Sequence, residues 1–388
     1  MLKNTAVLGS VPANPLRSMW RTVSTALAGL PVLLLFFVCS AAAYSSFFAK
    51  WGFCGTTESG DCMLQQMIEG TARRPWVYRR LLPELASWLD SHMPGSIHGY
   101  LLQALQNGNL GLHYASPIAA TAEAPEMLLT FYCIYVLSLL AFFGAALLLW
   151  RIGTHLTSDK VASALAALIF VLAFPIFLTV GGNFYDFTEL FFFALASWIA
   201  LTQMPYWLIL LAPVATYNKE SFFFFLVTLY PVLVARFGWR RSAGWLSVAV
   251  LASGVAYWWV KSRYIGNPGG MVEFHLSDHI EYFRRFRHYG QFEFQYGMLA
   301  PRGFNIINIL LVVLLVRSGF KRLPTAMRRQ IQLALVINVP LFLLFCYPGE
   351  LRNLSMLYLG LVAMLACALS HWLSGFYRSR PPTPLNGG

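Results

Sequence analysis

The sequence has few charged residues. Only 11% of its 388 residues are Asp, Glu, Lys or Arg, against roughly 25% in an average soluble domain. The mean hydropathy is +0.58, and several apolar runs approach the length of about 20 residues that spans the hydrocarbon core of a bilayer. This composition excludes an ordinary soluble fold and predicts an all-α polytopic membrane protein.

Standard nucleotide and zinc motifs are also missing. The sequence contains no G-x-G-x-x-G, Walker loop, H-E-x-x-H, C-x-x-C or D-x-D pattern, so a nucleotide cradle, a standard zinc site and an ATP-driven transport subunit lack support. Basic residues number 28 and acidic residues 16, a net charge of +12. Because Lys and Arg gather on the cytoplasmic side of membrane proteins, this excess does not imply nucleic acid.

Apolar runs predict about ten membrane spans within a single transmembrane domain at residues 1–380, followed by a disordered tail at 381–388. One run is too short to cross alone, which leaves a broken or re-entrant helix pair around Asn218 to Ser221 as an alternative. Two long outer loops, 48–126 and 261–302, separate groups of spans. The runs lie near 25–47, 127–150, 161–181, 187–202, 206–217, 221–236, 243–260, 303–317, 330–346 and 354–373.

The distribution of charge predicts the orientation. If both termini are cytoplasmic, most basic residues of the short loops and chain ends fall on that side, and Asp159 is the only acidic residue there. This pattern follows the positive-inside rule and predicts a multi-pass protein of the cytoplasmic (inner) membrane, with the long loops facing the periplasm or outside. A secretory signal is the alternative for the first span, because small residues lie near its end at 40–43, but the apolar run is longer than a signal core.

Cysteines are sparse and scattered. Four of the six lie in apolar runs, whereas Cys54 and Cys62 share a polar loop. Their spacing would allow a small disulfide in an oxidising compartment, and whether they pair stays open.

The first long loop carries the densest set of chemical groups. Asp61 precedes four arginines at 73, 74, 79 and 80, and an amphipathic helix is expected from Leu81, with Leu81, Leu82, Leu85, Trp88 and Leu89 on one face. In one interpretation the arginines bind lipid headgroups and Asp61 caps a helix. In the other, the acid and the guanidinium groups meet at the membrane surface to activate a hydroxyl beside a phosphate.

Ionisable residues near the ends of the other spans are further candidates, because such groups are expensive in a membrane and usually functional. Asp186, followed by Glu189, is either a helix cap or a site residue. Lys219 and Glu220 form either an internal ion pair or a phosphate contact, and Arg352, next to Glu350, binds either a loop or a substrate anion. The aromatic and charged residues at 274–289 suit either a sugar-binding wall or an amphipathic interface helix.

Several short motifs together resemble a known family. Asp61 is followed by Tyr78-Arg79-Arg80-Leu81-Leu82-Pro83, and Tyr185-Asp186-Phe187, Asn218-Lys219-Glu220-Ser221 and Gly349-Glu350-Leu351-Arg352-Asn353 lie beside later spans. These motifs are spread over most of the chain. Their combination resembles bacterial polytopic membrane proteins related to the GT-C glycosyltransferase superfamily.

The resemblance implies a GT-C-like fold and an enzyme that takes a sugar from a polyprenyl-phosphate donor on the non-cytoplasmic face. Asp61 would be the base, with Glu58 or Glu69 as alternatives because the usual pair of acids is a single Asp here. Arg79 or Arg80, with Lys219 or Arg352, would hold the lipid phosphate. Supporting roles fall to Tyr78, Glu69, Asp186, Glu220 and Glu350.

We therefore expect a membrane glycosyltransferase that acts on a glycan, lipid or protein of the cell envelope, in a polysaccharide pathway. Membrane lipids are its other expected partners, no cofactor is assigned, and a divalent metal stays open. Two other functions are kept: a transporter or flippase for a lipid-linked or anionic solute, and a non-catalytic subunit of a polysaccharide assembly complex.

Overall fold

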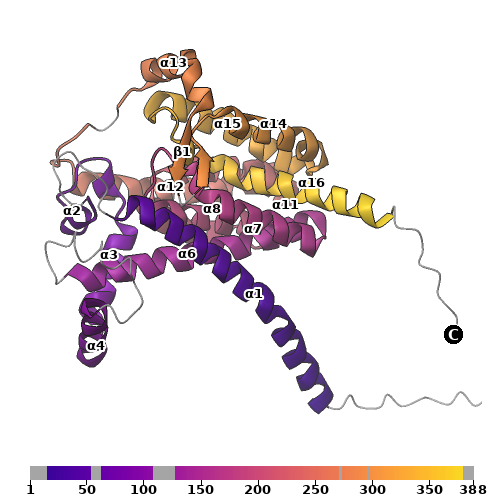
Figure 1. The fold of residues 1–388 in the computed structure, drawn as a ribbon, viewed down its shortest axis with the longest axis horizontal. Helices are drawn as coiled ribbons and strands as arrows, with labels where there is room; N and C mark the ends of the chain where they lie inside the picture. Colours follow the sequence, from indigo (N-terminus) through magenta and orange to yellow (C-terminus); the bar gives the residue numbers. More distant parts are fainter. Residues whose placement is uncertain (1–14, 54–62, 108–126, 271–272, 296–297, 379–388) are drawn as a thin grey trace, which may run out of the picture.

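The computed structural model describes residues 15–53, 63–107, 127–270, 273–295 and 298–378. Asp61, Cys54, Cys62 and the tail predicted at 381–388 lie outside these ranges. The described chain is almost entirely helical, as predicted (Figure 1). Its elements are α1 (Pro15–Trp51), α2 (Met63–Glu69), η1 (Trp76–Tyr78), α3 (Leu81–His92), α4 (Gly95–Gln106), α6 (Leu128–Thr157), α7 (Lys160–Phe177), α8 (Tyr185–Thr202), α9 (Tyr206–Asn218), α10 (Ser221–Thr228), α11 (Tyr230–Phe237), α12 (Trp239–Arg263), α13 (Leu276–Arg284), η3 (Phe286–Gly290), β1 (Phe292–Gln295), β2 (Met298–Pro301), α14 (Ile306–Gly319), η4 (Phe320–Arg322), α15 (Thr325–Phe345), η5 (Leu351–Leu357) and α16 (Tyr358–Arg378).

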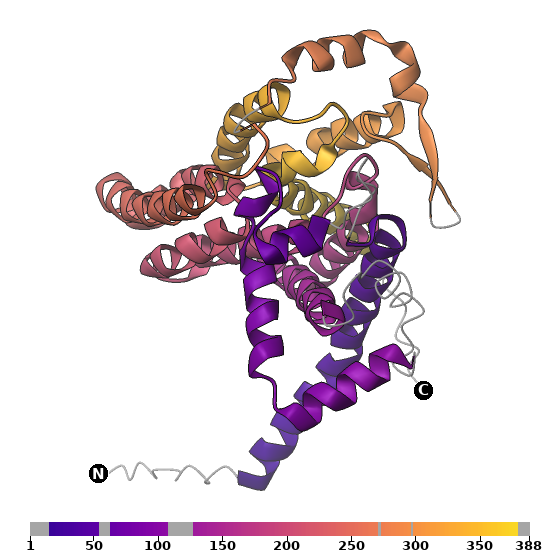
Figure 2. The same ribbon diagram turned by 90° about the vertical axis from the view of Figure 1, so that its left-hand side faces the viewer.

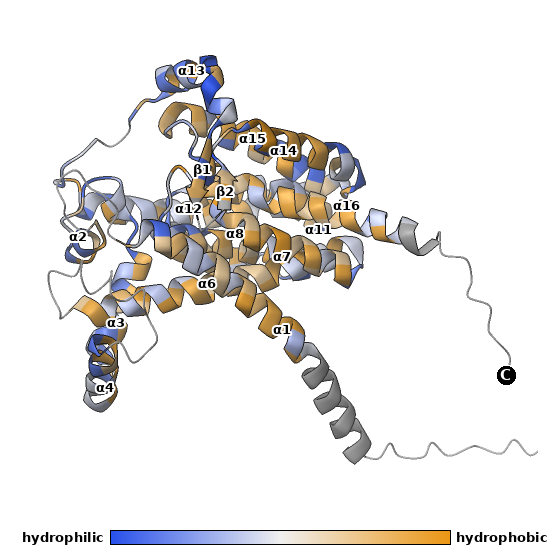
Figure 3. Ribbon diagram, viewed as in Figure 1, coloured by the Kyte–Doolittle hydropathy of each residue, from blue (hydrophilic) through white to orange (hydrophobic). Residues whose placement is uncertain are grey.

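Six segments of the described chain are long and apolar enough to cross a membrane. They are Gly29–Trp51, Leu128–Thr157, Lys160–Phe177, Trp239–Arg263, Thr325–Phe345 and Leu351–Gly375. Hydrophobic residues make up much of these helices, as the colouring of the ribbon by residue hydropathy shows (Figure 3). The chain is therefore an α-helical, multi-pass membrane protein by length and composition, with shorter apolar helices such as α9 and α14 packed among the long ones.

Helix α8 lies at the centre of the bundle. Its Phe187 ring is fully buried and lies 4.7 Å from the ring of Phe47 on α1, 4.9 Å from Phe142 on α6 and 5.4 Å from Phe174 on α7. A helix that is apolar all round belongs in a core. Aromatic packing on several sides thus fixes the beginning of α8, where its two acidic residues are found.

The polar segments gather at one end of the bundle, which we call the loop end. It carries α2, α3 and α4 from one segment and α13 with the β1–β2 hairpin from another (Figure 1). Figure 2 shows this end facing the viewer. The expected helix after Leu81 is present as α3. Within its predicted apolar face, Leu85 and Trp88 are 37% and 55% exposed, whereas Leu82 is buried.

The chain is not continuously helical around Asn218. A broken helix pair here was one of the two alternatives that the sequence left open. Helix α9 ends at Asn218, Lys219 is extended (φ −160°, ψ 134°), and α10 begins at Ser221. The extended residue sends the chain into a new helix and leaves a charged pair of residues, Lys219 and Glu220, at the junction.

Candidate functional site

Seven ionisable residues from four segments meet at the loop end. Each lies where a helix begins or ends, so the antiparallel packing of the bundle brings them to the same level. We call this group the charged cluster. It comprises Arg79 between η1 and α3, Asp186 and Glu189 in the first turns of α8, Lys219 and Glu220 in the α9–α10 break, and Glu350 and Arg352 before α16.

Lys219 is the most deeply held cation of the cluster. Its Nζ atom lies 2.9 Å from Asp186 Oδ1 and 2.8 Å from Glu189 Oε2, and the Lys219 side chain is 5% exposed. The expected alternative, a pair between Lys219 and Glu220, is not what the structure has, because Glu220 binds Arg79. The extended backbone at Lys219 directs the ammonium group back toward α8.

Arg79 links the first polar segment to the break. Its Nη2 atom donates to Glu220 Oε1 at 3.0 Å, and its Nη1 atom donates to the hydroxyl of Tyr185. Burial lowers the pKa of the Arg79 guanidinium, but the charge and hydrogen bond of Glu220 together with Tyr185 outweigh burial and raise that pKa above its ordinary value. Arg79 is therefore a permanent cation.

Arg352 holds the other side of the cluster. Its Nη1 atom lies 3.3 Å from Asp186 Oδ2, and its Nη2 atom lies 3.3 Å from Glu350 Oε2. A Cβ atom added to Gly181 would lie 2.7 Å from Glu350 Oε1 and 3.2 Å from Arg352 Nε. Glycine at this position therefore allows the Glu350–Arg352 pair to approach the backbone.

Asp186 contacts both the backbone before α8 and two cations. Its Oδ2 atom accepts from the backbone N–H of Asn183 at 2.9 Å, and the same carboxylate pairs with Lys219 and Arg352. Glu189, which the sequence-based list of candidates omits, accepts from Ser355 Oγ at 3.1 Å and from Ser221 Oγ. Its position three residues after Asp186, on the same helical face, was the signal that could have found it.

Some polar atoms of the cluster have no partner. Within the described chain, Arg79 Nε, Arg352 Nε and Glu220 Oε2 are buried without a hydrogen bond. A buried donor left unpaired costs about 1–3 kcal/mol. Two unpaired guanidinium donors in one cluster suit an anion, and an unpaired carboxylate oxygen suits a proton or a hydroxyl group.

Three other predicted site residues, Arg80, Tyr78 and Glu69, lie outside the cluster. Arg80 donates to Glu84 Oε1 at 3.0 Å and to the carbonyl oxygens of Met67 and Ile68, so its guanidinium holds the end of α2. Tyr78 is buried, and its hydroxyl has no partner within the described chain. Glu69 is exposed and accepts from Gln65. The predicted base, Asp61, lies outside the described residues.

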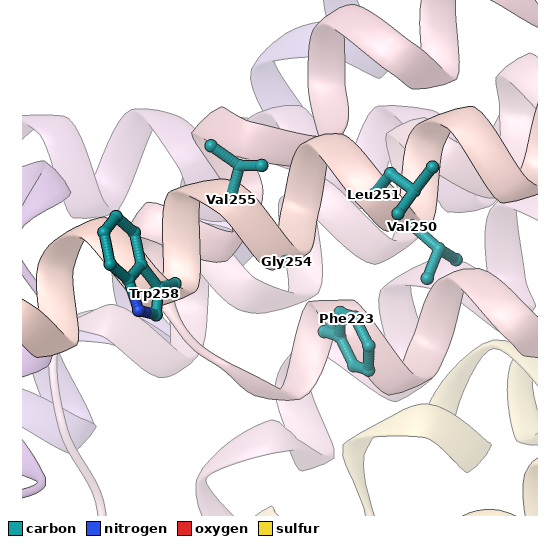
Figure 4. Close-up of a pocket in the computed structure, with 6 residues that line it drawn as sticks. All are labelled: Phe223, Val250, Leu251, Gly254, Val255 and Trp258. Atoms are coloured by element: carbon teal, nitrogen blue, oxygen red, sulfur yellow. The ribbon is translucent and has the colours of Figure 1, made fainter.

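An apolar groove runs along the bundle surface close to the break. It has a volume of about 330 Å³ and is lined by Phe223 of α10 and by Val250, Leu251, Gly254, Val255 and Trp258 of α12 (Figure 4). Leu251, Val255 and Trp258 are each more than 60% exposed. The groove begins three residues after Glu220 and opens on an apolar outer face.

Among the described residues, no group of three or more His, Cys, Asp or Glu has the arrangement of a metal site.

Comparison of the chain with known protein families, with curated proteins and with solved structures finds no match. The resemblance to the GT-C superfamily therefore rests on the short sequence motifs.

Proposed function

We propose that the chain is a membrane glycosyltransferase that moves a sugar from a polyprenyl-phosphate donor to an acceptor of the cell envelope. The observation that supports this function best is the charged cluster, in which Arg79 and Arg352 each keep a buried Nε donor that has no partner among the described residues. Arginine matches phosphate geometry through its fork of donors, and such bonds strengthen where water is excluded.

In the proposed reaction, Arg79, Lys219 and Arg352 hold the phosphate and stabilise the charge that develops on it as the sugar departs. The acceptor hydroxyl attacks the anomeric carbon, the bond from that carbon to the phosphate oxygen breaks, and Asp61 takes the hydroxyl proton. Glu220, Asp186 and Glu350 pair with the cations while the donor is absent, and thereby fix their positions.

The groove between α10 and α12 supports a lipid-linked donor. Its lining is apolar throughout, and it begins about one helical turn beyond Glu220. A donor whose phosphate lies at the cluster would therefore find an apolar surface for its chain on the adjacent face of the bundle.

The proposed topology has ten spans, both termini in the cytoplasm and the loop end outside an inner membrane. In this arrangement the cytoplasm is on the side of the bundle opposite the loop end. The helix ends on that side carry exposed basic residues such as Arg151, Arg240 and Arg241. The charged cluster then faces the compartment where polyprenyl-linked sugars are used.

The decisive experiment compares glycans and polyprenyl-linked lipids, by mass spectrometry, in a strain that lacks the gene and carries a rescuing copy. The rescuing chains are the wild type, Asp61→Asn, Arg79→Gln, Arg352→Gln and a control, Glu281→Gln, which removes an exposed carboxylate of α13. We expect the wild type and the control to restore one sugar of a glycan, and the site variants to fail at equal membrane levels.

Other outcomes point to the other functions. Loss of the whole lipid-linked precursor from the outer leaflet, with its accumulation on the inner side, would indicate a flippase. The discontinuity between α9 and α10 is the feature that favours this second candidate, because broken helices often line transport sites. Full rescue by all three site variants would contradict both functions and favour a structural subunit of an assembly complex.

A further inference from the structure

The segment between α12 and α14 exposes large aromatic side chains outside the membrane helices. Phe274 is 68% exposed, Phe286 is 88% exposed and Phe294 is 75% exposed. Apolar exposure is ordinary on the lipid-facing sides of the bundle, but these residues belong to a polar segment at the loop end. We call residues 274–295 and 298–301, which include α13, η3 and the β1–β2 hairpin, the interface unit.

The hairpin has two different faces. Phe294 is paired with Leu299 and Phe292 with Pro301 in the antiparallel register, which places these four residues on one face. Glu293 lies on the opposite face and pairs with Lys50 Nζ at 3.0 Å, and Lys50 also donates to the carbonyl oxygen of Thr179 at 2.6 Å. The polar face is thus bound to the bundle, and the apolar face remains exposed.

Helix α13 is bound to the bundle in a similar way. The backbone N–H of His275 donates to the carbonyl oxygen of Leu344 at 2.9 Å, and His279 Nε2 lies 2.9 Å from the carbonyl oxygen of Cys346. Leu276 and Ile280, one turn apart, are 41% and 47% exposed. They form an apolar stripe beside the inner face, and Glu281 lies on the polar side.

The attachment points give the level of the interface unit along the bundle. Lys50 is in the last turn of α1, and Leu344 and Cys346 mark the end of α15, and both helices are long enough to span a membrane. The unit also lies at the side of the bundle, not over its centre (Figures 1 and 2). Arg284, Arg285 and Arg287 are exposed next to Phe286.

We propose that the interface unit lies in the bilayer surface at the loop end, where it binds phospholipids. The phenylalanines and the Leu276–Ile280 stripe insert below the headgroups, and the three arginines bind lipid phosphates. Aromatic residues favour this depth of a bilayer, and arginine binds phosphate through several donors at once. This inference uses none of the residues of the charged cluster and is independent of the proposed function.

The test measures the depth of single spin labels in the full chain reconstituted in nanodiscs of phosphatidylglycerol and phosphatidylethanolamine. The background variant has its six cysteines replaced, and labels are attached at Phe286→Cys, Phe294→Cys, Ile280→Cys and, as the matched control on the same helix, Glu281→Cys. Collision rates with oxygen, which concentrates in lipid, and with a water-soluble nickel complex report the surroundings of each label.

We expect the labels at positions 280, 286 and 294 to collide more with oxygen than with nickel, and the label at position 281 to show the reverse. Equal, high access of nickel to all four labels would place the unit in water and overturn the proposal. Low access of both reagents at positions 286 and 294 would show that protein covers the surface, which also overturns it. A Tm equal to that of the unlabelled chain confirms that each labelled chain is folded.

Discussion

The residues of the charged cluster are held by ion pairs between different segments. Lys219 pairs with two carboxylates of α8, and Asp186 pairs with two cations from different segments. Buried ion pairs contribute little net stability compared with apolar residues of equal volume, but removal of one partner leaves an uncompensated charge. Single substitutions in the cluster should therefore destabilise the fold, and we expect the largest loss of stability at Lys219.

Lys219→Met should destabilise the fold strongly. The substitution keeps the length of the side chain but leaves Asp186 and Glu189 buried with one cation fewer, and loss of one partner of a buried pair costs about 3–5 kcal/mol. Thermal unfolding in one fixed detergent measures the change. The control is Arg285→Gln, which breaks an exposed pair with Glu281 and should change the stability by less than about 1 kcal/mol. Equal Tm values for the two variants would contradict the buried network.

Gly181→Ala should impair the proposed transfer more than it impairs folding. The added methyl group would lie 2.7 Å from Glu350 Oε1, so the Glu350 side chain must move and release Arg352. We expect sugar transfer to fall at least about tenfold, corresponding to about 1.4 kcal/mol in the barrier, with a Tm close to the wild-type value. Unchanged transfer would mean that the position of Glu350 is unimportant for the site.

At this scale the sequence predicted the members of the cluster better than their pairing. Arg79, Asp186, Lys219 and Arg352 stand out because ionisable residues near membrane spans are rare. Their partners could not be predicted, because Lys219 and Asp186 are 33 residues apart and Arg352 and Asp186 are 166 apart. Arg80 shows the same limit: it is next to Arg79 in sequence, yet its guanidinium binds the end of α2.

At the scale of the helices, close packing fixes how the elements approach. Gly319, the last residue of α14, lies against the backbone of α16: a Cβ atom added there would contact the carbonyl oxygen of Met364 and lie 2.8 Å from its Cα and carbonyl carbon atoms. Small residues allow membrane helices to approach closely. Because the neighbouring atoms belong to the backbone of Met364, a change of side-chain rotamer cannot relieve the contact.

Gly319→Ala should therefore force α14 and α16 apart and lower the stability by about 1–3 kcal/mol. Gly244→Ala is the matched control, because Gly244 is an exposed glycine of α12 with no atom near the added Cβ. Alanine favours a helix over glycine by up to about 1 kcal/mol, so this control should not lower the Tm. The contact would be refuted by a Tm for Gly319→Ala at or above that of Gly244→Ala.

The groove gives a test of the same kind for the proposed donor. Gly254→Leu should fill the space between α12 and Phe223, since the added Cβ itself has room at 3.8 Å from the Phe223 ring. If the lipid chain of the donor lies there, the KM for the donor should rise severalfold while the Tm stays near that of Gly254→Ala. An unchanged KM would remove the groove from the proposed site.

Hydrophobic runs predicted the helical class and most of the long helices, and the polar interruption at Lys219–Glu220 predicted the broken pair. The runs did not determine which helix is central, because α8 is no more apolar in sequence than its neighbours; its position follows from aromatic contacts with α1, α6 and α7. On α3, Leu85 and Trp88 of the predicted apolar face are exposed and Leu82 is buried, and the helix packs against α6, a contact that its sequence alone did not predict.

At the scale of the whole molecule, the main feature is that the two ends of the bundle carry different charged residues. The charged cluster and the interface unit lie at the loop end, whereas helix ends rich in Arg and Lys lie at the other. The beginning of α1 and the end of α16 both lie away from the loop end (Figure 1). The distribution of positive charge then sets which end faces the cytoplasm.

Thiol labelling in intact cells tests this orientation. In a chain without native cysteines, Glu69→Cys on α2 should react with a membrane-impermeant maleimide, and Arg240→Cys at the opposite end should react only after the inner membrane is permeabilised. Both side chains are exposed, so burial does not confound the comparison. The reverse pattern would invert the proposed topology.

The long sequence separation within the charged cluster also has a consequence for biosynthesis. As α8 enters the membrane, Asp186 and Glu189 have no basic partner until Lys219 follows, and Arg352 arrives only just before the final helix. A nascent chain therefore has a single cation, Lys219, for two acids of its growing bundle until synthesis is nearly finished. Insertion chaperones and membrane proteases would meet this intermediate, and a chain that stops before Arg352 should be degraded rapidly even though most of its spans are present.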